Sequence, residues 1–274
     1  MFTYIDPDVR RRLVDRGRLR RIDKDGQPLD VDAPPVPGRL SINLLGPIPL
    51  PVNVNGWRET FDWYAAVRNT ELSRVESLAS ALRKEGGQHL FAELASSMAV
   101  NSVLIHGDPS AGERPLVRVH SNCLTGDVFG SERCECGPQL EAAMRQIAGH
   151  PDGGILIYMA GHEGRGIGLW AKAATYLLQD DGEDTYQANR SLGLPDDSRD
   201  FSDAAALLKY FLGPKPFDLL TNNPKKVADL HAAGLTQAKS VKHVTGVSEW
   251  NRRYLEAKAE KGHQIEPEDL NQDD

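Results

Sequence analysis

The stretch Gly153–Gly182, GGILIYMAGHEGRGIGLWAKAATYLLQDDG, decides the fold class of this chain. It opens with GGILIYMA, a short apolar run bounded by glycines, which is typical of a buried strand. A glycine-rich turn follows, and residues 167–182 then predict a helix that ends at Gly182. A buried strand, a tight turn and a helix in this order predict one unit of a layered α/β domain.

The same alternation of strands and helices continues on both sides of this stretch. We expect strands at 101–107, 115–120 and 217–221, and helices at 137–150, 203–213 and 223–235. The helix at 137–150 places Leu140, Ala143, Met144 and Ile147 on one apolar face. In the last helix, Pro224 lies near the start and Gly234 near the end, as helix-capping preferences predict.

The chain divides near residue 90. We expect an N-terminal extension at 1–90, a catalytic domain at 91–262 and an acidic, disordered tail at 263–274. The extension contains seven arginines between Arg10 and Arg21, which we interpret as a basic helix with a solvated face rather than an anion-binding arm. A proline-rich connector follows at 31–40, and the prolines at 44–56 disfavour a central strand there. Beyond it, a strand is expected at 59–68 and a helix at 71–87.

Composition excludes several classes of protein. The chain is 40% apolar and 26% charged, which is ordinary for a globular protein, and no apolar run approaches the roughly 20 residues of a membrane span. The N-terminus lacks the apolar region of a secretory signal, so a cytoplasmic location is expected. The net charge of −7 argues against a general nucleic-acid-binding protein.

All three cysteines of the chain lie in CLTGDVFGSERCEC, Cys123–Cys136. If the segment is extended, Cys134 and Cys136 point to the same face, and Cys123 can approach across a loop whose turns use Gly126, Gly130 and Gly137. Three thiolates would leave one position of a tetrahedral zinc ion open, as in catalytic sites. Two alternatives stay open: the cysteines could be buried apolar residues, or His120 could complete a closed site.

Three further segments suit a nucleotide ligand. The turn GHEGRGIG leads into a helix and contains Arg165, whose guanidinium can donate paired hydrogen bonds to a phosphate or to a carbonyl edge. TNNPKK, which begins at Thr221, follows a buried strand and opens a helix. LPDDSRDF carries Asp197 and Arg199. Each segment alone could be an ordinary turn, cap or solvated loop, but with zinc they indicate nucleotide chemistry. The H-x-E and P-C-x-x-C signature of nucleobase deaminases is absent.

These motifs resemble GTP cyclohydrolase II. The resemblance rests on RVHSNCLTGDVFGSERCECGPQLEAA, EGRGIGL, YLLQDDGEDTYQAN and LTNNPKKV, and it covers roughly residues 99 to 262. It implies a mixed sheet with flanking helices, Zn²⁺, and Mg²⁺ with the nucleotide. It also implies opening of the guanine ring of GTP to give 2,5-diamino-6-ribosylamino-pyrimidinone 5'-phosphate, formate and pyrophosphate. A homodimer is expected.

By motif, the resemblance implies a role for each of the following residues. Zinc would be bound by Cys123, Cys134 and Cys136. The nucleotide would be contacted by Arg118, Val119, His120, Ser121, Asn122, Gln139, Glu163, Gly164, Arg165, Thr185, Thr221 and Lys226. Asp197 would be the proton acceptor, Arg199 would act at the α-phosphorus, and Tyr176 would assist attack on the ring.

The chain also departs from the family's pattern. Asn122 stands where the family usually has glutamate, and Gly161-His162 stands where it has Arg-Gln. These departures lie beside the expected base pocket and leave the identity of the base open. Two alternatives are kept, of which the first follows from the departures. One is a paralogue that opens the ring of UMP in uracil catabolism. The other is a catalytically silent nucleotide-binding protein with a structural zinc.

Overall fold

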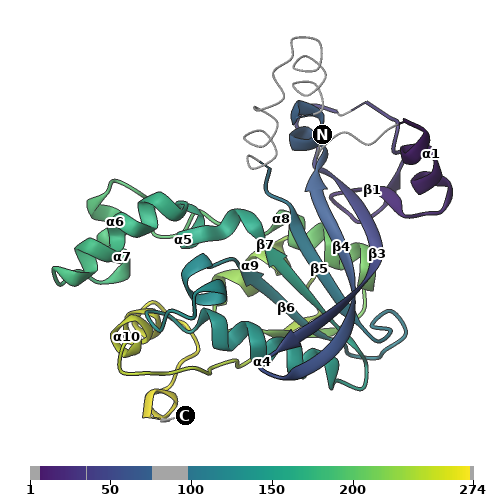
Figure 1. The fold of residues 1–274 in the computed structure, drawn as a ribbon. Coiled ribbons are helices and arrows are strands. Elements are labelled where there is room, and N and C mark those ends of the chain that lie inside the picture. Colours follow the sequence, from purple (N-terminus) through teal and green to yellow (C-terminus); the bar gives the residue numbers. More distant parts are fainter. Residues whose placement is uncertain (1–6, 35, 76–97, 272–274) are drawn as a thin grey trace.

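Strand β7, Gly154–Met159, lies in the middle of a mixed nine-stranded sheet (Figure 1). Its side chains alternate between the two faces of the sheet. Ile155 and Ile157 enter one apolar cluster, and Leu156 enters the cluster on the other side. Because both faces are covered, the strand is apolar throughout, and the buried strand predicted there is confirmed.

The computed structural model describes residues 7–34, 36–75 and 98–271. The other strands are β1 (Leu19–Asp23), β2 (Pro28–Leu29), β3 (Ser41–Val54), β4 (Trp57–Arg68), β5 (Asn101–His106), β6 (Leu116–Ser121), β8 (Phe217–Leu220) and β9 (Ala238–Val241). The helices are α1 (Pro7–Asp15), α4 (Cys136–Ala148), α5 (Glu163–Gly166), α6 (Leu169–Asp180), α7 (Thr185–Ser191), α8 (Ser202–Leu212), α9 (Pro224–Ala232) and α10 (Arg252–Glu260), with short helical turns η1 (Leu124–Val128), η2 (Ala160–His162) and η3 (Pro267–Asn271). None of the helices described is long and apolar enough to cross a membrane.

The strand order is β2-β1-β3-β4-β5-β7-β6-β8-β9. Strands β6, β7, β8 and β9 run parallel where they pair, and the remaining pairs are antiparallel. Helix α8 packs on one face through Leu207 and Leu208, and α4 packs on the other through Met144 and Ile147. The α/β class is therefore confirmed, and the carboxyl ends of β6, β7 and β8 meet at one edge of the sheet, where ligands bind in such folds.

The N-terminal strands belong to the same sheet, because β4 pairs antiparallel with β5. The division near residue 90 stays a prediction, and the sheet runs across it. Strand β3 runs through the prolines at 44–56, but this half of the strand pairs only with β4 and is an edge, so it does not contradict the prediction that they disfavour a central strand. Strand β1 pairs with β3 only as far as Leu45, so Pro49 and Pro51 lie on a free edge where no N–H is needed. Of the helix expected at 71–87, residues 71–75 are helical and the others lie outside the described residues.

The basic stretch is not one helix. Helix α1 ends at Asp15, and the last arginines belong to β1. Arg21 is buried and donates to the side chain of Asn43, and Arg20 donates to Tyr210 on α8. In LRRID, Leu19, Arg21 and Ile22 are buried while Arg20 and Asp23 are only partly buried, because this segment is a strand paired with β2 and β3 and not a continuation of the helix.

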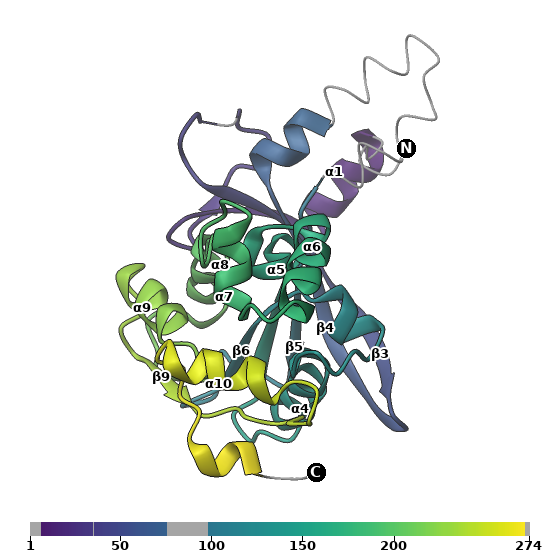
Figure 2. The ribbon, with the colours of Figure 1, turned by 90° about the vertical axis from the view of Figure 1, so that its left-hand side faces the viewer.

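The C-terminal tail is not a detached disordered segment as far as residue 271. Ile265 and Leu270 are buried with Leu255 of α10, and Asp269 pairs with Lys242. The composition of this segment is acidic, but it contains two buried apolar residues, Ile265 and Leu270, five positions apart. Figure 2 shows α10 lying beside α7, close to the carboxyl edge of the parallel strands.

Candidate active site

The three cysteines converge from two places in the fold. Cys123 follows the end of β6, and Cys136 is the first residue of α4. Their sulfur atoms and that of Cys134 all lie within 4.8 Å of one another. The extended segment expected for Cys134–Cys136 was wrong: Glu135 has φ −88° and ψ 9°, so a turn into α4 brings the two sulfurs together.

Two glycines make room for this cluster. A Cβ atom on Gly126 would lie 3.0 Å from the sulfur of Cys134 and 3.2 Å from that of Cys123. A Cβ atom on Gly137 would lie 2.5 Å from the carbonyl oxygen of Gly126. Glycine is therefore required at both positions by close approach, whereas Gly130 is required by its φ of +66°.

The cluster fits a soft divalent cation. Cys123 and Cys134 have sulfurs 3.6 Å apart, and the Cys123 thiol raises the pKa of Cys134 and of Cys136 while burial adds to the effect. Three thiolates at this spacing repel one another unless a cation lies between them. Thiolate ligands in a tetrahedral arrangement select zinc or an iron–sulfur centre. Among the described residues no other group of His, Cys, Asp or Glu comes together in this way.

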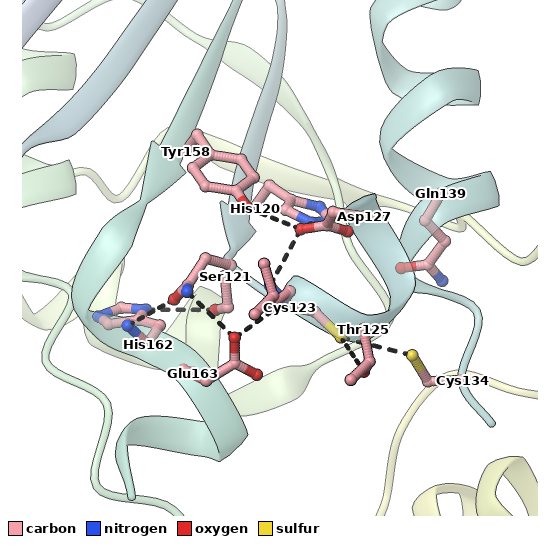
Figure 3. Close-up of polar contacts among 12 residues, drawn as sticks. His120, Ser121, Cys123, Thr125, Asp127, Cys134, Gln139, Tyr158, His162 and Glu163 are labelled. Carbon is pink, nitrogen blue, oxygen red and sulfur yellow. Dashed lines mark hydrogen bonds and ion pairs between the residues drawn. The ribbon is translucent and has the colours of Figure 1, made fainter. Parts of the chain in front are cut away.

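His120 does not belong to the cluster. Its Nε2 atom lies 3.1 Å from both carboxylate oxygens of Asp127, which also accepts from the hydroxyl of Tyr158 at 2.9 Å (Figure 3). Burial lowers the pKa of His120, so the ring is neutral and Nε2–H donates to Asp127. Asp127 in turn accepts from the backbone N–H of Cys123 at 3.0 Å. His120 thus anchors the cysteine loop to the sheet, and the cluster consists of the three cysteines alone.

A second anchor comes from the helix after the glycine-rich turn. The Lys172 ammonium donates to Glu163 at 2.7 Å and lies 3.1 Å from the sulfur of Cys123. Glu163 also accepts from the backbone N–H of Leu124 at 2.8 Å. Although burial opposes its charge, the hydrogen bond to Glu163 and the Cys123 sulfur raise the pKa of Lys172. A permanent cation therefore faces the cysteine cluster.

One pocket contains the cysteines and most of the predicted site. It lies at the carboxyl ends of the parallel strands, and Tyr254 and Lys258 of α10 are among its lining residues. Seven cationic side chains line it: Arg118, Arg133, Arg165, Lys172, Arg199, Lys226 and Lys258. The only carboxylate among the lining residues is Glu135, which is buried and paired with Lys258. The pocket is strongly basic in a chain of net charge −7, so it suits a polyanion.

Among the described residues, three of these cations, Lys226, Arg118 and Arg165, have no carboxylate partner in their hydrogen bonds. Lys226 donates to the carbonyl of Val119, and burial lowers its pKa well below the ordinary value. Arg118 donates to the carbonyl of Leu220 and to Gln139, its Nε has no partner, and burial lowers its pKa to about 10. Buried cations without counter-ions are expensive for the folded state, and an anionic ligand would compensate them.

Arg165 lies at the other side of the pocket. It has φ +61°, an unusual backbone conformation for a residue with a side chain. Its guanidinium packs over the ring of Tyr186 at 4.1 Å, donates to Thr185, and leaves Nη2 without a partner. The glycine-rich turn therefore delivers a fixed guanidinium whose free N–H groups remain available to a ligand.

Asp197 and Arg199 form a bidentate ion pair. The guanidinium donates from Nε at 2.9 Å and from Nη2 at 2.6 Å, and Nη1 reaches the hydroxyl of Ser121 at 3.2 Å. Arg199 lines the pocket, and Asp197 lies behind it. The backbone N–H of Ser198 donates to the carbonyl of Arg165, so this loop packs on the glycine-rich turn.

Most of the residues that the motifs predict come together in the pocket. Its lining includes Arg118, His120, Ser121, Asn122, Cys123, Cys134, Cys136, Gln139, Gly164, Arg165, Tyr176, Thr185, Arg199, Thr221 and Lys226. Val119, Glu163 and Asp197 are not part of the lining. Val119 is buried in the sheet, and Asn223 caps α9 as the simpler interpretation of TNNPKK predicted.

Sequence reasoning missed one wall of the pocket. Tyr254, Lys258 and His263 line it from α10 and the turn after it. His263 keeps an unpartnered Nδ1, and burial lowers its pKa to about 3. The spacing of Tyr254 and Lys258 at four residues indicates one helix face, but nothing local to the segment shows which surface that face meets.

The family model of GTP cyclohydrolase II matches residues 82–242, which is more than half of the chain. The chain belongs to the GTP cyclohydrolase II family. The match includes every residue assigned to the site by motif and ends before α10. The recognition from motifs is therefore confirmed.

Curated relatives carry the same segment within longer proteins. The chain is 51% identical over 163 residues to the probable bifunctional riboflavin biosynthesis protein RIBA 2, chloroplastic, of Oryza sativa subsp. japonica, which covers 58% of this chain and 29% of the relative. It is 44% identical over 194 residues to the riboflavin biosynthesis protein RibBA of Nocardia farcinica, covering 70% and 45%. It is 49% identical over 165 residues to the monofunctional riboflavin biosynthesis protein RIBA 3, chloroplastic, of Arabidopsis thaliana, covering 60% and 32%. The chain thus spans less than half the length of these relatives.

Proposed function

We propose that this GTP cyclohydrolase II family member is a zinc-dependent hydrolase that opens the guanine ring of GTP and releases formate and pyrophosphate. The observation that carries the proposal is the pocket itself, in which three convergent thiols and a basic lining face the same cavity. A metal-ligating cluster suits attack on a ring carbon, and a concentration of cations suits a triphosphate. The relatives named as riboflavin biosynthesis proteins support the same reaction.

In this proposal, Cys123, Cys134 and Cys136 hold zinc. A bound zinc ion would supply a Lewis acid and lower the pKa of a water at the site. The chain's own residues set the conditions around it. Lys172 offsets the charge of the thiolates, and Tyr176 lies beside the cluster, where its hydroxyl is 3.2 Å from that of Thr125. Tyr176 is thus placed to orient the reacting base, and burial raises its pKa, which keeps the phenol protonated.

The phosphates are assigned to the basic side of the pocket. Lys226 and Arg118 provide buried positive charge, and Arg165 provides a guanidinium that can donate two hydrogen bonds to a phosphate. Mg²⁺ would accompany the triphosphate. Arg199 stabilises charge at the α-phosphorus, because a guanidinium remains protonated and points two N–H groups in fixed directions. Asp197 holds that guanidinium and accepts a proton, and the ion pair lowers its pKa although burial opposes this.

The experiment is a turnover assay on purified protein with GTP and, separately, UMP. Formate and pyrophosphate release from GTP is expected, with no turnover of UMP. Turnover of UMP alone would replace GTP as the substrate. Binding of GTP without formation of formate, in protein with a full complement of zinc, would leave the chain a nucleotide-binding protein and contradict the proposal.

We infer a homodimer as the working assembly. Large apolar side chains are exposed on α6, where Trp170 is 91% and Leu177 68% exposed, and Phe129 at the end of η1 is 71% exposed. Residues seven apart on a helix share a face, so Trp170 and Leu177 present one apolar surface. Light scattering of the purified protein should give twice the chain mass of 30.1 kDa. A monomer at micromolar concentration would contradict the inference.

A further inference from the structure

Strand β4 reaches the candidate site from the part of the chain that precedes the family match. It ends at Arg68, and Ala66 lies opposite Asn101 at the start of β5. Arg68 therefore lies at the same edge of the sheet as the carboxyl end of β7, which pairs with β5 on its other side. This position brings the Arg68 side chain to the loop that precedes α8.

Arg68 forms two ion pairs with that loop. Its Nε donates to Asp203 at 2.7 Å, and its Nη2 donates to Asp200 at 2.7 Å and to the hydroxyl of Ser202 at 3.1 Å. The Asp203 side chain is 8% exposed and accepts from Asn101 as well, at 3.1 Å. Burial opposes ionisation of Asp200, but the hydrogen bonds from Arg68 and Ser202 lower its pKa to about 2. Burial raises the pKa of Asp203, although its ion pair with Arg68 opposes this. One guanidinium thus holds both carboxyl groups.

A chain of hydrogen bonds connects this anchor to Arg199. The carbonyl of Asp200 accepts from Nε2 of His162 at 3.0 Å, since a carbonyl can only accept. Nδ1 of His162 must then accept from the hydroxyl of Ser121, at 3.2 Å. The same hydroxyl accepts from Nη1 of Arg199 at 3.2 Å. The loop bearing Asp197 and Arg199 is therefore held from β4 on one side and from β6 and η2 on the other.

We propose that Arg68 is a positioning residue for the reaction: it holds the Asp197–Arg199 loop in place for phosphate chemistry. The inference rests on the proposed function. It gives the N-terminal strands a role in the active site, although they lie outside the residues that match the family. One ion pair of Arg68 ends at Asp200, the residue after Arg199, and the other at Asp203 in the first turn of α8, so Arg68 holds both the loop and the helix that follows it.

The test compares Arg68→Met and Arg68→Lys with wild type. Methionine retains an apolar stem but makes neither ion pair, whereas lysine can pair with only one carboxylate at a time. We expect kcat for pyrophosphate release from GTP to fall at least tenfold in Arg68→Met and less in Arg68→Lys. The KM for GTP should change less than twofold, and zinc content should be unchanged. If Arg68→Met does not fold, Arg68→Lys decides the question: a kcat below that of wild type is expected, and a wild-type kcat would overturn the inference.

Arg114→Met is the matched control. Arg114 pairs with Asp218 at 2.6 Å and is 39% exposed against 32% for Arg68, but it precedes β6 at the opposite edge of the sheet. Its kcat should equal that of wild type. An equal fall in both variants, or wild-type kcat in Arg68→Met, would overturn the inference.

Hydrogen exchange separates this inference from the proposed function. Backbone amides of residues 196–203 should exchange at least tenfold faster in Arg68→Met than in wild type, and at the wild-type rate in Arg114→Met. This readout needs no substrate. If wild type does not turn over GTP, the proposed function fails while the exchange rates still decide whether Arg68 holds the loop. Unchanged exchange would show that it does not.

Discussion

Replacing Lys226 by methionine should stabilise the folded protein while removing its response to nucleotide. Lys226 is 4% exposed, and among the described residues its ammonium donates to the carbonyl of Val119 and lies 5.4 Å from the centre of the Phe201 ring, with no carboxylate partner. Burial lowers its pKa well below the ordinary value of 10.5, and the nearby positive charges of Arg118 and Arg199 lower it further. The folded state therefore bears an uncompensated buried charge, which methionine of similar length would remove.

The magnitude follows from two opposing contributions. Relief from burying an unpaired ammonium is worth several kcal/mol in real proteins after relaxation. Loss of the hydrogen bond to Val119 costs about 1 kcal/mol. We expect the free energy of unfolding to rise by about 1–3 kcal/mol at neutral pH. Between the folded-state pKa of Lys226 and 10.5, the unfolded chain binds a proton that the folded chain does not, so the free energy of unfolding of wild type rises with pH. The stability advantage of Lys226→Met over wild type therefore decreases across this pH range.

Urea denaturation with and without GTP measures both effects. GTP at 100 times its Kd should stabilise wild type by about 2.7 kcal/mol and should have almost no effect on Lys226→Met. Lys209→Met is the control, since Lys209 on α8 pairs with Asp25 far from the pocket and its loss should cost about 0–1 kcal/mol. A Lys226→Met protein less stable than wild type without nucleotide would refute the reasoning that this charge is held for a ligand.

Three shorter predictions concern the metal cluster and acid stability. Cys134→Ser should abolish formate release and lower zinc content, measured by metal analysis; full activity would refute its role. Lys172→Met should release zinc to a chelator about 10–100-fold faster, because the cation facing Cys123 is lost; an unchanged release rate would contradict this. Burial lowers the pKa of His162 and of His243 to about 4 from 6.5, so the unfolded chain takes up protons first and unfolding free energy should fall as pH drops from 6.5 to 4. Glutamine at both positions should flatten that slope in urea titrations, and an unaltered slope would count against these two histidines.

The elements with strong local signals could be predicted from the sequence. GILIYM is a buried strand, and the helices at α4, α6, α8 and α9 follow from apolar spacing with glycine and proline at their ends. Strand β3 was not predicted because its prolines argue against a central strand, and they are accommodated here because that half of β3 has an unpaired edge. The ordered part of the acidic tail was not predicted either, because Ile265 and Leu270 are recognisable as core residues only once the fold packs them against Leu255.

The sequence by itself determined the chemistry available to this protein, namely three thiols in one short stretch, an Asp–Arg loop and lysines at a helix start. Those properties belong to residue types and spacings, which a linear pattern records. Only the tertiary structure decided that His120 binds Asp127 and not the cluster, and that Lys258 of α10 pairs with buried Glu135 beside the cysteines. Such pairings join residues that are far apart in the chain or face different ways at close spacing. They depend on which element packs against which, because a buried charge is stable only where the fold brings a partner near it.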